Sequence, residues 1–414
     1  MTENKKLNIG LIGFGVVCEG IYNVLQQTPT LNASIKKICI KHAGKKRNAP
    51  QELFTTNVEA LLDDDSINVI VELIDDADAA YKIVTTALRN KKHVVSANKK
   101  MIAAHLHELL ILQKENEVSL LYEAAVCGSI PVIRNLEEYY DNDLLNSFSG
   151  IVNGSTNFIL TKMKEEGLSY ENALKQAQEL GFAESNPALD VEGKDAVNKL
   201  TIVLQHAYGI TVKPETIVHK GITQLHSSDT KYAAEKNYNI KLVANAKRID
   251  ENKIVAFVLP TFVESKNQLH HIRNEFNGVL IGSKLADEQF LYGKGAGRYP
   301  TSSAVLSDIA ALRYDYKYEY KKTKNNASNY QLSNDFLLKI FVSFNEDAEI
   351  NVSFFDSIED RYFNKNRNHL VGFISLKNLQ QADWFNDEMV SVIAFDGDDN
   401  KISTTTFLHE TILN

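Results

Sequence analysis

Short apolar runs alternate with helical patterns along the first third of the chain. The apolar runs cover residues 7–14, 34–40, 69–74, 93–96 and 119–123, and helix-like periodicity separates them over 17–26, 77–90 and 102–116. Strands that alternate with helices in this way predict a parallel, doubly wound sheet with helices on both faces. We therefore expect an α/β domain over residues 1–132.

The pattern changes beyond Pro131, where longer elements follow. Helices are predicted over 169–180 and 194–208, and alternating residues predict antiparallel strands over 147–152, 240–247 and 253–260. These elements predict a second, α+β domain over residues 133–312.

The last hundred residues begin with a change of composition. Residues 313–335 are rich in Tyr, Lys and Asn and poor in aliphatics, which predicts a linker. Strand-like runs over 336–344, 369–376 and 389–395 follow it. We expect a small C-terminal α+β module over residues 336–414.

The composition is that of an ordinary folded protein of 414 residues, with 44% apolar and 24% charged residues. The net charge of −8 argues against a nucleic acid partner. Three cysteines without pair spacing predict neither disulfides nor a zinc site. The first residues lack a signal-peptide pattern and no apolar run approaches the ~18 residues of a membrane span, so we expect a cytoplasmic protein and no membrane partner.

A glycine turn between the first strand and the first helix predicts a Rossmann-like dinucleotide site. Gly13, Phe14 and Gly15 supply a tight turn and a close backbone approach for a pyrophosphate, and Val16 and Val17 begin the helix whose N–H groups face that anion. The third glycine of the fingerprint is replaced by Cys18, and Gly20 follows two positions later. A turn without a ligand is the alternative interpretation.

The cofactor type depends on the residues after the second strand. No acidic residue stands there to hold a ribose hydroxyl, and the basic loop 41–47 follows instead. Arg47 in this loop suits a 2′-phosphate, so we predict NADP, with NAD still possible. A solvated charged loop is an equally weighted alternative.

Lysines and carboxylates supply the candidate chemistry. Ser96 and Lys99 follow a strand at the carboxyl edge of the predicted sheet, where such folds bind ligands. Asp195 and Lys199 lie four residues apart on one face of a largely apolar helix. Carboxylates there could hold a substrate ammonium while a lysine takes the proton of a hydroxyl during hydride transfer. The alternative is an ordinary surface ion pair worth about 0.3–0.5 kcal/mol.

Several blocks in a fixed order carry a resemblance to a known family. They are GLIGFG at 10–15, VVSANK at 94–99, YEAAV at 122–126 with Gly128 and 130–131, GIVNGSTN at 150–157, ELGFAE at 179–184, DVEG at 190–193 with Asp195 and Lys199, and GAG at 295–297 with 300–301. Over about 310 residues the chain thus resembles homoserine dehydrogenases. The resemblance implies NAD(P)-dependent interconversion of L-homoserine and L-aspartate 4-semialdehyde, a step towards threonine and methionine.

The resemblance also implies roles for individual residues. Lys199 would be the main acid/base group with Lys99 as its partner, and Glu184 and Asp195 would hold the substrate's amino acid end with Asp190 nearby. Ser96, Lys99 and Gly297 match cofactor-binding positions, and 295–309 would return to complete the nucleotide-binding domain. A monovalent cation, usually sodium, would be held by Glu123, Val126, Gly128 and Ile130. The second domain would bind substrate and form a homodimer or homotetramer.

Three departures from the family pattern keep alternatives open. Cys18 replaces a glycine, Asp75 and Asp76 stand where paired glycines usually adjoin the cofactor, and the C-terminal module lacks the Pro-Gly turn and helix of an amino acid-binding ACT domain. Feedback by threonine is therefore not inferred. The alternative functions are an NADP-dependent oxidoreductase of another amino acid or aldehyde, and a nucleotide-binding regulator without turnover.

Overall fold

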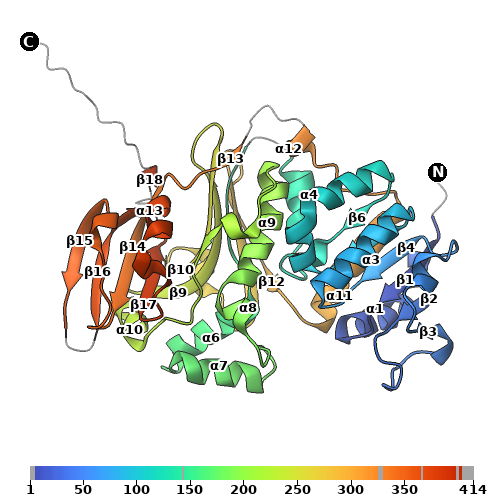
Figure 1. The fold of residues 1–414 in the computed structure, drawn as a ribbon, viewed down its shortest axis with the longest axis horizontal. Coiled ribbons are helices and arrows are strands. Elements are labelled where there is room, and N and C mark those ends of the chain that lie inside the picture. The colour runs from blue at the N-terminus through green and yellow to red at the C-terminus, as the bar shows by residue number, and fades with distance from the viewer. Residues whose placement is uncertain (1–4, 142–143, 325–329, 365–366, 398–400, 403–414) are drawn as a thin grey trace, which may run out of the picture. The chain divides into compact units, whose positions relative to one another are not determined.

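A computed structural model describes residues 5–141, 144–324, 330–364, 367–397 and 401–402 of the chain (Figure 1). The chain divides into two compact units. Unit 1 comprises Met1–Gly154, Lys194–Thr216 and Glu275–Ala327, and unit 2 comprises Ser155–Gly193, Ile217–Asn274 and Ser328–Asn414. Each unit is described by itself below.

The parallel sheet predicted from the sequence is present in unit 1. Its six strands have the order β3-β2-β1-β4-β5-β6, and every pair is parallel. The strands are β1 (Leu7–Ile12), β2 (Ala33–Cys39), β3 (Phe54–Thr55), β4 (Val69–Glu72), β5 (His93–Ser96) and β6 (Leu120–Leu121). The α/β class and the doubly wound order are therefore confirmed.

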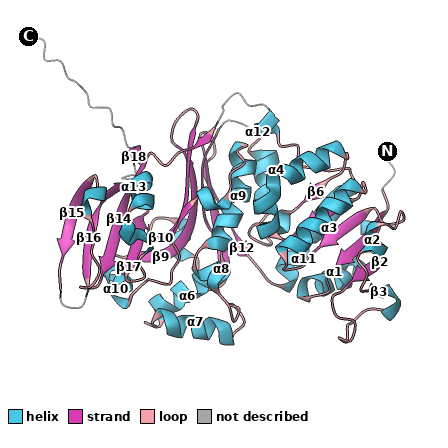
Figure 2. Ribbon diagram, in the orientation of Figure 1, coloured by secondary structure: helices cyan, strands magenta, loops and turns pink. Residues whose placement is uncertain are grey.

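Helices flank this sheet in two packed pairs (Figure 2). Helix α1 (Val16–Gln27) packs against α11 (Arg298–Leu312), and α3 (Ala77–Arg89) packs against α4 (Lys99–Glu115); the short α2 is Glu59–Leu62. From β1 the chain proceeds towards β2, but from β4 it proceeds in the opposite direction towards β5. Right-handed crossovers consequently place α1 and α3 on opposite faces.

The contact between α1 and α11 explains one glycine of the first helix. A Cβ atom at Gly20 would lie 2.5 Å from Ser302 Oγ, so a larger residue would push the two helices apart. Arg298 and Glu19 form an ion pair of 2.7 Å across the same contact. The returning segment thus packs on the parallel-sheet part of unit 1, while Cys18 is buried inside α1.

The rest of unit 1 supports helix α9 (Lys194–Tyr208), which packs against α4 (Figure 1). Strands β7 (Leu145–Ile151), β11 (Phe276–Ser283) and β12 (Asp287–Lys294) form an antiparallel group in the order β12-β11-β7. Short helical segments complete the unit: η3 (Glu123–Ala125), α5 (Val132–Arg134), η4 (Asn135–Tyr139), η5 (Pro214–Thr216) and α12 (Lys321–Lys324).

The prediction that residues 313–335 form a linker is wrong for the part that the structure describes in unit 1. Tyr318 and Tyr320 are buried, and the Tyr318 ring makes edge-to-face contacts with the rings of Tyr122 and Tyr320. Aromatic rings supply the apolar surface that aliphatic side chains would otherwise provide. Residues 325–329 lie outside the described residues.

Unit 2 contains mainly antiparallel strands and short helices. The helices are α6 (Gly154–Glu165), α7 (Tyr170–Glu179), α8 (Ala188–Val191), α10 (Ser227–Glu235) and α13 (Leu376–Gln381), and the strands are β8 (Val218–His219), β9 (Tyr238–Arg248), β10 (Lys253–Glu264), β13 (Gln331–Leu332), β14 (Phe336–Phe344), β15 (Ser357–Tyr362), β16 (Asn368–Ser375), β17 (Val390–Phe395) and β18 (Lys401–Ile402). The predicted helix at 169–180 and the predicted strands of this region are confirmed. Short parallel pairings join β10 to β8, β13 and β17.

The C-terminal strands share a core with the middle of the chain. Phe257 and Leu259 of β10 belong to the same buried cluster as Leu338 and Ile340 of β14 and Trp384. The α+β character predicted for this region agrees with the mixed strands and helices. The division into domains 1–132, 133–312 and 336–414 stays a prediction, because a compact unit is not the same as a segment that folds independently.

Candidate active site

A buried carboxylate lies at the start of α9. Asp195 is 2% exposed, and its Oδ2 atom accepts a hydrogen bond of 2.8 Å from Asn153 Nδ2 and lies 2.8 Å from Lys199 Nζ. Its Oδ1 atom lies 2.7 Å from Lys99 Nζ, at the start of α4. Burial alone would raise the pKa of Asp195, but the charges of Lys199 and Lys99 overcome it and hold that pKa well below its ordinary value.

The two lysines differ in their access to solvent. The Lys199 side chain is 9% exposed, and its Nζ also donates to the Val152 carbonyl oxygen at 2.5 Å. The Lys99 side chain is 42% exposed. The interpretation of Asp195 and Lys199 as an ordinary surface pair is therefore wrong, since both lie inside the unit and the site reaches solvent at Lys99.

The cluster carries one carboxylate and two ammonium groups, so it has an excess of one positive charge. Such an excess stabilises negative charge that develops on a nearby oxygen. Lys199 can also exchange a proton with that oxygen. The arrangement suits a reaction that converts a hydroxyl group into a carbonyl group or the reverse.

The glycine turn leaves the amino end of α1 open. Gly13 has a φ of +94°, and a Cβ atom at Gly15 would meet no atom within 4 Å. Gly15 is the N-cap residue, and within the described residues no side chain caps this helix end. Backbone N–H groups at Val16 and Val17 are thus available to a phosphate, which fits a dinucleotide. Phe14 instead packs its ring edgewise on Phe54 at 5.2 Å.

The basic loop is fastened to its own backbone. Arg47 donates from Nη1 to the Lys45 carbonyl and from Nη2 to the His42 carbonyl, both at 2.7 Å. Its guanidinium also lies over the Phe54 ring at 5.6 Å, next to Phe14 of the glycine turn. Arg47 therefore lies near the turn, but two of its nitrogen atoms already have partners.

Ser96 lies in a buried hydrogen-bonded pair rather than on an open surface. Its Oγ donates to Glu72 Oε2 at 2.6 Å, and Glu72 Oε1 accepts the Ile74 backbone N–H at 2.7 Å. Burial raises the pKa of Glu72 to about 7, although these hydrogen bonds oppose the rise. Glu72 was not predicted as a site residue, and its only signal in the sequence is a charged residue at the end of an otherwise apolar strand. The predicted contact of Ser96 with cofactor stays a prediction.

The acidic pair Asp75 and Asp76 is exposed. Asp76 is the N-cap of α3, where its side chain accepts the backbone N–H groups of Asp78 and Ala79. These hydrogen bonds lower the pKa of Asp76. One of the two departures from paired glycines thus has a structural role as a helix cap. Gly297 is the N-cap of α11 with a φ of +118°, and its contact with cofactor stays a prediction.

A second buried acidic group surrounds Glu123. Its carboxylate oxygens accept the backbone N–H groups of Ile133 and Arg134, both at 2.9 Å, while its own N–H donates to Asp308 Oδ2 at 2.9 Å. Arg134 Nη2 lies 2.7 Å from Asp308 Oδ1. Burial raises the pKa of Glu123 to about 8 and that of Asp308 to about 6. The Arg134 guanidinium pairs with Asp308, while Glu123 accepts backbone N–H groups. When both carboxylates are ionised they exceed this guanidinium by one negative charge, which fits a bound cation.

The turn after Glu123 offers backbone oxygens rather than more charged ligands. Val126, Gly128 and Ile130 lie in this turn, and a Cβ atom at Gly128 would lie 2.5 Å from the Gly295 carbonyl oxygen. In the described part of the chain, no three His, Cys, Asp or Glu side chains come together as a metal site. A cation there would need carbonyl ligands, so the four predicted ligands stay a prediction. Asp308 was missed because it lies 185 residues from Glu123.

Glu184 and Asp190 belong to unit 2, whereas Asp195 and Lys199 belong to unit 1. Glu184 is exposed in the loop after α7, and Asp190 lies in α8. Their predicted roles in substrate binding stay predictions. Over the described residues, no helix combines the length and the apolar character that crossing a bilayer requires.

Comparison with known proteins identifies relatives that all carry the same family description. A family model described as homoserine dehydrogenase matches residues 131–310, and one described as homoserine dehydrogenase, NAD binding domain, matches residues 13–123. The homoserine dehydrogenase of Bacillus subtilis (strain 168) is 39% identical over 317 residues, which cover 74% of this chain and 73% of that protein. The corresponding protein of Helicobacter pylori is 37% identical over 316 residues, or 74% of each chain.

Solved structures agree with these relatives. A homoserine dehydrogenase from Thiobacillus denitrificans superposes with a TM-score of 0.81 at 27% identity, covering 95% of this chain and 98% of that one. A hyperthermophilic archaeal homoserine dehydrogenase in complex with NADPH has a TM-score of 0.65 at 25% identity, covering 76% of this chain and 99% of that one. Both sequence and fold therefore point to one family.

Proposed function

Because the chain belongs to the homoserine dehydrogenase family, we propose that Lys199, Lys99 and Asp195 perform the proton transfer of its reaction. The enzyme is an NAD(P)-dependent oxidoreductase that interconverts L-homoserine and L-aspartate 4-semialdehyde. The observation that carries the assignment is the buried Asp195 carboxylate with an ammonium group on each oxygen. Glu319 also contacts two lysines, Lys317 at 3.7 Å and Lys324 at 2.9 Å, but its side chain is 42% exposed.

The excess positive charge supports a role at the reacting oxygen. During reduction the Lys199 ammonium gives a proton to the aldehyde oxygen and becomes a neutral amine. During oxidation Lys199 must first release its proton to solvent, and the neutral amine then takes the hydroxyl proton of homoserine. Asp195 orients both lysines through its two oxygens, and Lys99 stabilises the developing negative charge. By the family resemblance, Glu184 and Asp195 would hold or orient the amino acid end of the substrate, with Asp190 nearby.

The cofactor preferred in this proposal is NADP, with NAD as the alternative. When bound, the nicotinamide accepts the hydride of homoserine or supplies it to the aldehyde. Support comes from the uncapped amino end of α1 and from Arg47 beside the glycine turn. The N–H groups of Val16 and Val17 would hold a phosphate oxygen, and Arg47 the 2′-phosphate.

A monovalent cation, sodium by the family resemblance, belongs to the same proposal. Glu123 would hold it together with backbone carbonyls of Val126, Gly128 and Ile130. The support is the negative excess of Glu123 and Asp308 over Arg134. The cation would neutralise this charge and fix the turn. We also propose a homodimer or homotetramer, which light scattering on the purified enzyme would test.

The decisive experiment measures absorbance at 340 nm with purified enzyme, L-homoserine and either NADP or NAD at alkaline pH. We expect homoserine-dependent reduction of cofactor that is faster with NADP. Reduction with another amino alcohol but not with homoserine would favour an oxidoreductase of different specificity. Cofactor binding without any reduction would favour a regulator without turnover and would remove the catalytic roles assigned above.

A further inference from the structure

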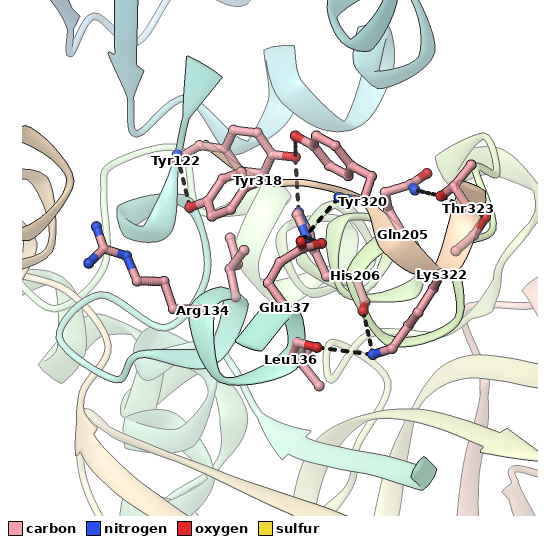
Figure 3. Close-up of polar contacts among 12 residues, drawn as sticks. Tyr122, Arg134, Leu136, Glu137, Gln205, His206, Tyr318, Tyr320, Lys322 and Thr323 are labelled. Carbon is pink, nitrogen blue, oxygen red and sulfur yellow. Dashed lines mark hydrogen bonds and ion pairs between the residues drawn. The ribbon is translucent and has the colours of Figure 1, made fainter. Parts of the chain in front are cut away.

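A closed set of buried hydrogen bonds lies at the carboxyl end of α9 (Figure 3). His206 Nδ1 lies 2.6 Å from Glu137 Oε1, and His206 Nε2 lies 2.9 Å from the Tyr122 hydroxyl oxygen. That hydroxyl lies 2.9 Å from the Tyr320 hydroxyl, and the Tyr320 backbone N–H donates to Glu137 Oε2 at 3.2 Å. We call Glu137, His206, Tyr122 and Tyr320 the His206 network.

Every polar side-chain group of the His206 network has a partner within it. Burial raises the pKa of both Tyr122 and Tyr320, so each phenol keeps the proton that it can donate. Burial would raise the pKa of Glu137, but hydrogen bonding to His206 reverses this and lowers that pKa, so the carboxylate accepts from Nδ1. A buried network with matched donors and acceptors holds its members in one arrangement.

The network acts on the same helix, and on the same face, as the candidate acid/base pair. Asp195, Lys199 and His206 are spaced by four and seven residues, which places them in one stripe of α9. Lys199 and His206 are about two turns, or ~10 Å, apart along the helix axis. The Lys322 ammonium also connects α9 to η4, because it donates hydrogen bonds to the His206 and Leu136 carbonyl oxygens at 2.9 and 3.0 Å.

The other end of the network lies next to the proposed cation site. Tyr122 immediately precedes Glu123, whose N–H donates to Asp308. The hydrogen bond between Tyr122 and His206 therefore joins α9 to the chain segment that begins η3. One network thus connects the segments that carry the two charged sites of unit 1.

From this connection we infer that the His206 network is a positioning device for the reaction, which fixes the rotation of α9 and so the placement of Lys199 and Asp195 opposite Lys99. The inference rests on the proposed roles of those three residues. A side-chain tip about 6 Å from the helix axis moves about 1 Å when the helix rotates by roughly 10°. A misplacement of about 1 Å can reduce a rate by about 10².

The test compares two substitutions that each remove one buried phenol oxygen. Tyr122→Phe breaks the network, whereas Tyr318→Phe removes a neighbouring hydroxyl that accepts only a long, 3.4 Å hydrogen bond from the Tyr122 backbone. Both side chains are buried, and their rings lie 5.1 Å apart, so each variant keeps the ring that packs there. Tyr122→Phe should lose more thermal stability than Tyr318→Phe, because it takes a 2.9 Å hydrogen-bond partner from both His206 and Tyr320. The comparison of kcat is therefore made per folded site. With kcat normalised to the number of NADPH-binding sites, we expect Tyr122→Phe to lower kcat about tenfold and to change the KM for NADP less than twofold. Tyr318→Phe should leave kcat within twofold of wild type.

A double-substitution cycle separates positioning from general destabilisation. Tyr122→Phe and His206→Gln break the same link, so the double variant should lose little more kcat than either single variant. Tyr122→Phe combined with Tyr318→Phe should show kcat equal to the product of the separate effects. Equal kcat for Tyr122→Phe and Tyr318→Phe, or independent effects of Tyr122→Phe and His206→Gln, would overturn the inference. If Tyr122→Phe does not fold, Tyr320→Phe breaks the adjacent link and carries the same expectation.

Failure of the network and failure of the proposed function give different results. The proposed function fails if wild-type enzyme shows no homoserine-dependent reduction, or if Lys199→Ala retains full turnover. The network fails if Lys199→Ala is inactive while Tyr122→Phe keeps wild-type kcat. For each variant, a fluorescence titration with NADPH gives the concentration of folded binding sites, and kcat is calculated per site.

Discussion

Two buried acidic sites in unit 1 differ in how many cations they contain. Asp195 has two ammonium groups on one carboxylate, whereas Glu123 and Asp308 lie beside one guanidinium, that of Arg134, which pairs with Asp308. All three carboxylates are nearly inaccessible to solvent. The pKa of Asp195 is lowered, but the pKa values of Glu123 and Asp308 are raised. Because burial is common to both sites, the supply of cations decides the sign of the shift.

The comparison teaches how one unit can prepare two opposite chemistries. A site with excess positive charge attracts the negative charge that develops on a substrate oxygen. A site with excess negative charge attracts a cation, which then removes the cost of burying two carboxylates. Changing the cation supply of each site should therefore alter different properties of the enzyme.

The largest effect should follow from removing a cation of the Asp195 site. We expect Lys199→Ala to lower kcat by ~10² or more, because general acid/base groups contribute about 10²- to 10⁴-fold. NADP binding should persist, as measured by fluorescence titration beside steady-state kinetics. Lys99→Ala should also reduce turnover. Its exposed neighbour Lys100 provides the control, because Lys100→Ala should leave turnover unchanged. Unchanged turnover in Lys199→Ala would remove this lysine from the mechanism.

Removing a charge from the Glu123 site should alter the cation response instead. We expect Glu123→Gln to raise the sodium concentration that gives half-maximal activity by about 10², since it removes the only charged ligand in the proposed set. The rates are measured over a sodium series with ionic strength held constant by tetramethylammonium chloride. Glu138→Gln, at an exposed position nearby, should keep the wild-type dependence. Wild-type activity that does not respond to any monovalent cation would contradict the proposed site.

Glu72 is a further buried acid, held in the described part of the chain by the Ser96 hydroxyl and the Ile74 N–H without a cation. Its pKa of about 7 in the folded protein exceeds the ordinary value of 4.5. Its contribution to stability is thus complete below about pH 4.5 and is lost as pH rises towards 7, with a magnitude of roughly 3 kcal/mol.

We expect this loss to disappear in Glu72→Gln, whose side chain is neutral at every pH. Thermal unfolding of wild type between pH 5 and 7.5 should show a falling melting temperature that is flatter in the variant. Glu52→Gln, at an exposed position, should retain the wild-type slope. Parallel pH profiles for wild type and Glu72→Gln would mean that Glu72 is ionised throughout this range.

The two acidic sites also show what sequence patterns can predict. Asp195 and Lys199 are one helical turn apart, so periodicity alone placed them on one face, and the strands and helices around them followed from alternation and glycine stops. Asp308 reaches Glu123 only because α11 returns to the sheet, and no local pattern records that contact. Composition wrongly predicts a linker at the tyrosines after Arg313, because burial of aromatic rings depends on partners elsewhere in the chain, such as His206.

The smallest effect concerns a cation that has no carboxylate partner among the described residues. Arg47 already donates to two carbonyl oxygens, so only part of its hydrogen-bonding capacity can serve a 2′-phosphate. We expect Arg47→Ala to raise the KM for NADPH about fivefold, or about 1 kcal/mol, and to leave the KM for NADH nearly unchanged. Lys46→Ala in the same exposed loop is the matched control for a general loss of positive charge. Equal effects of Arg47→Ala on the two cofactors would exclude the 2′-phosphate assignment and would make NAD the better supported cofactor.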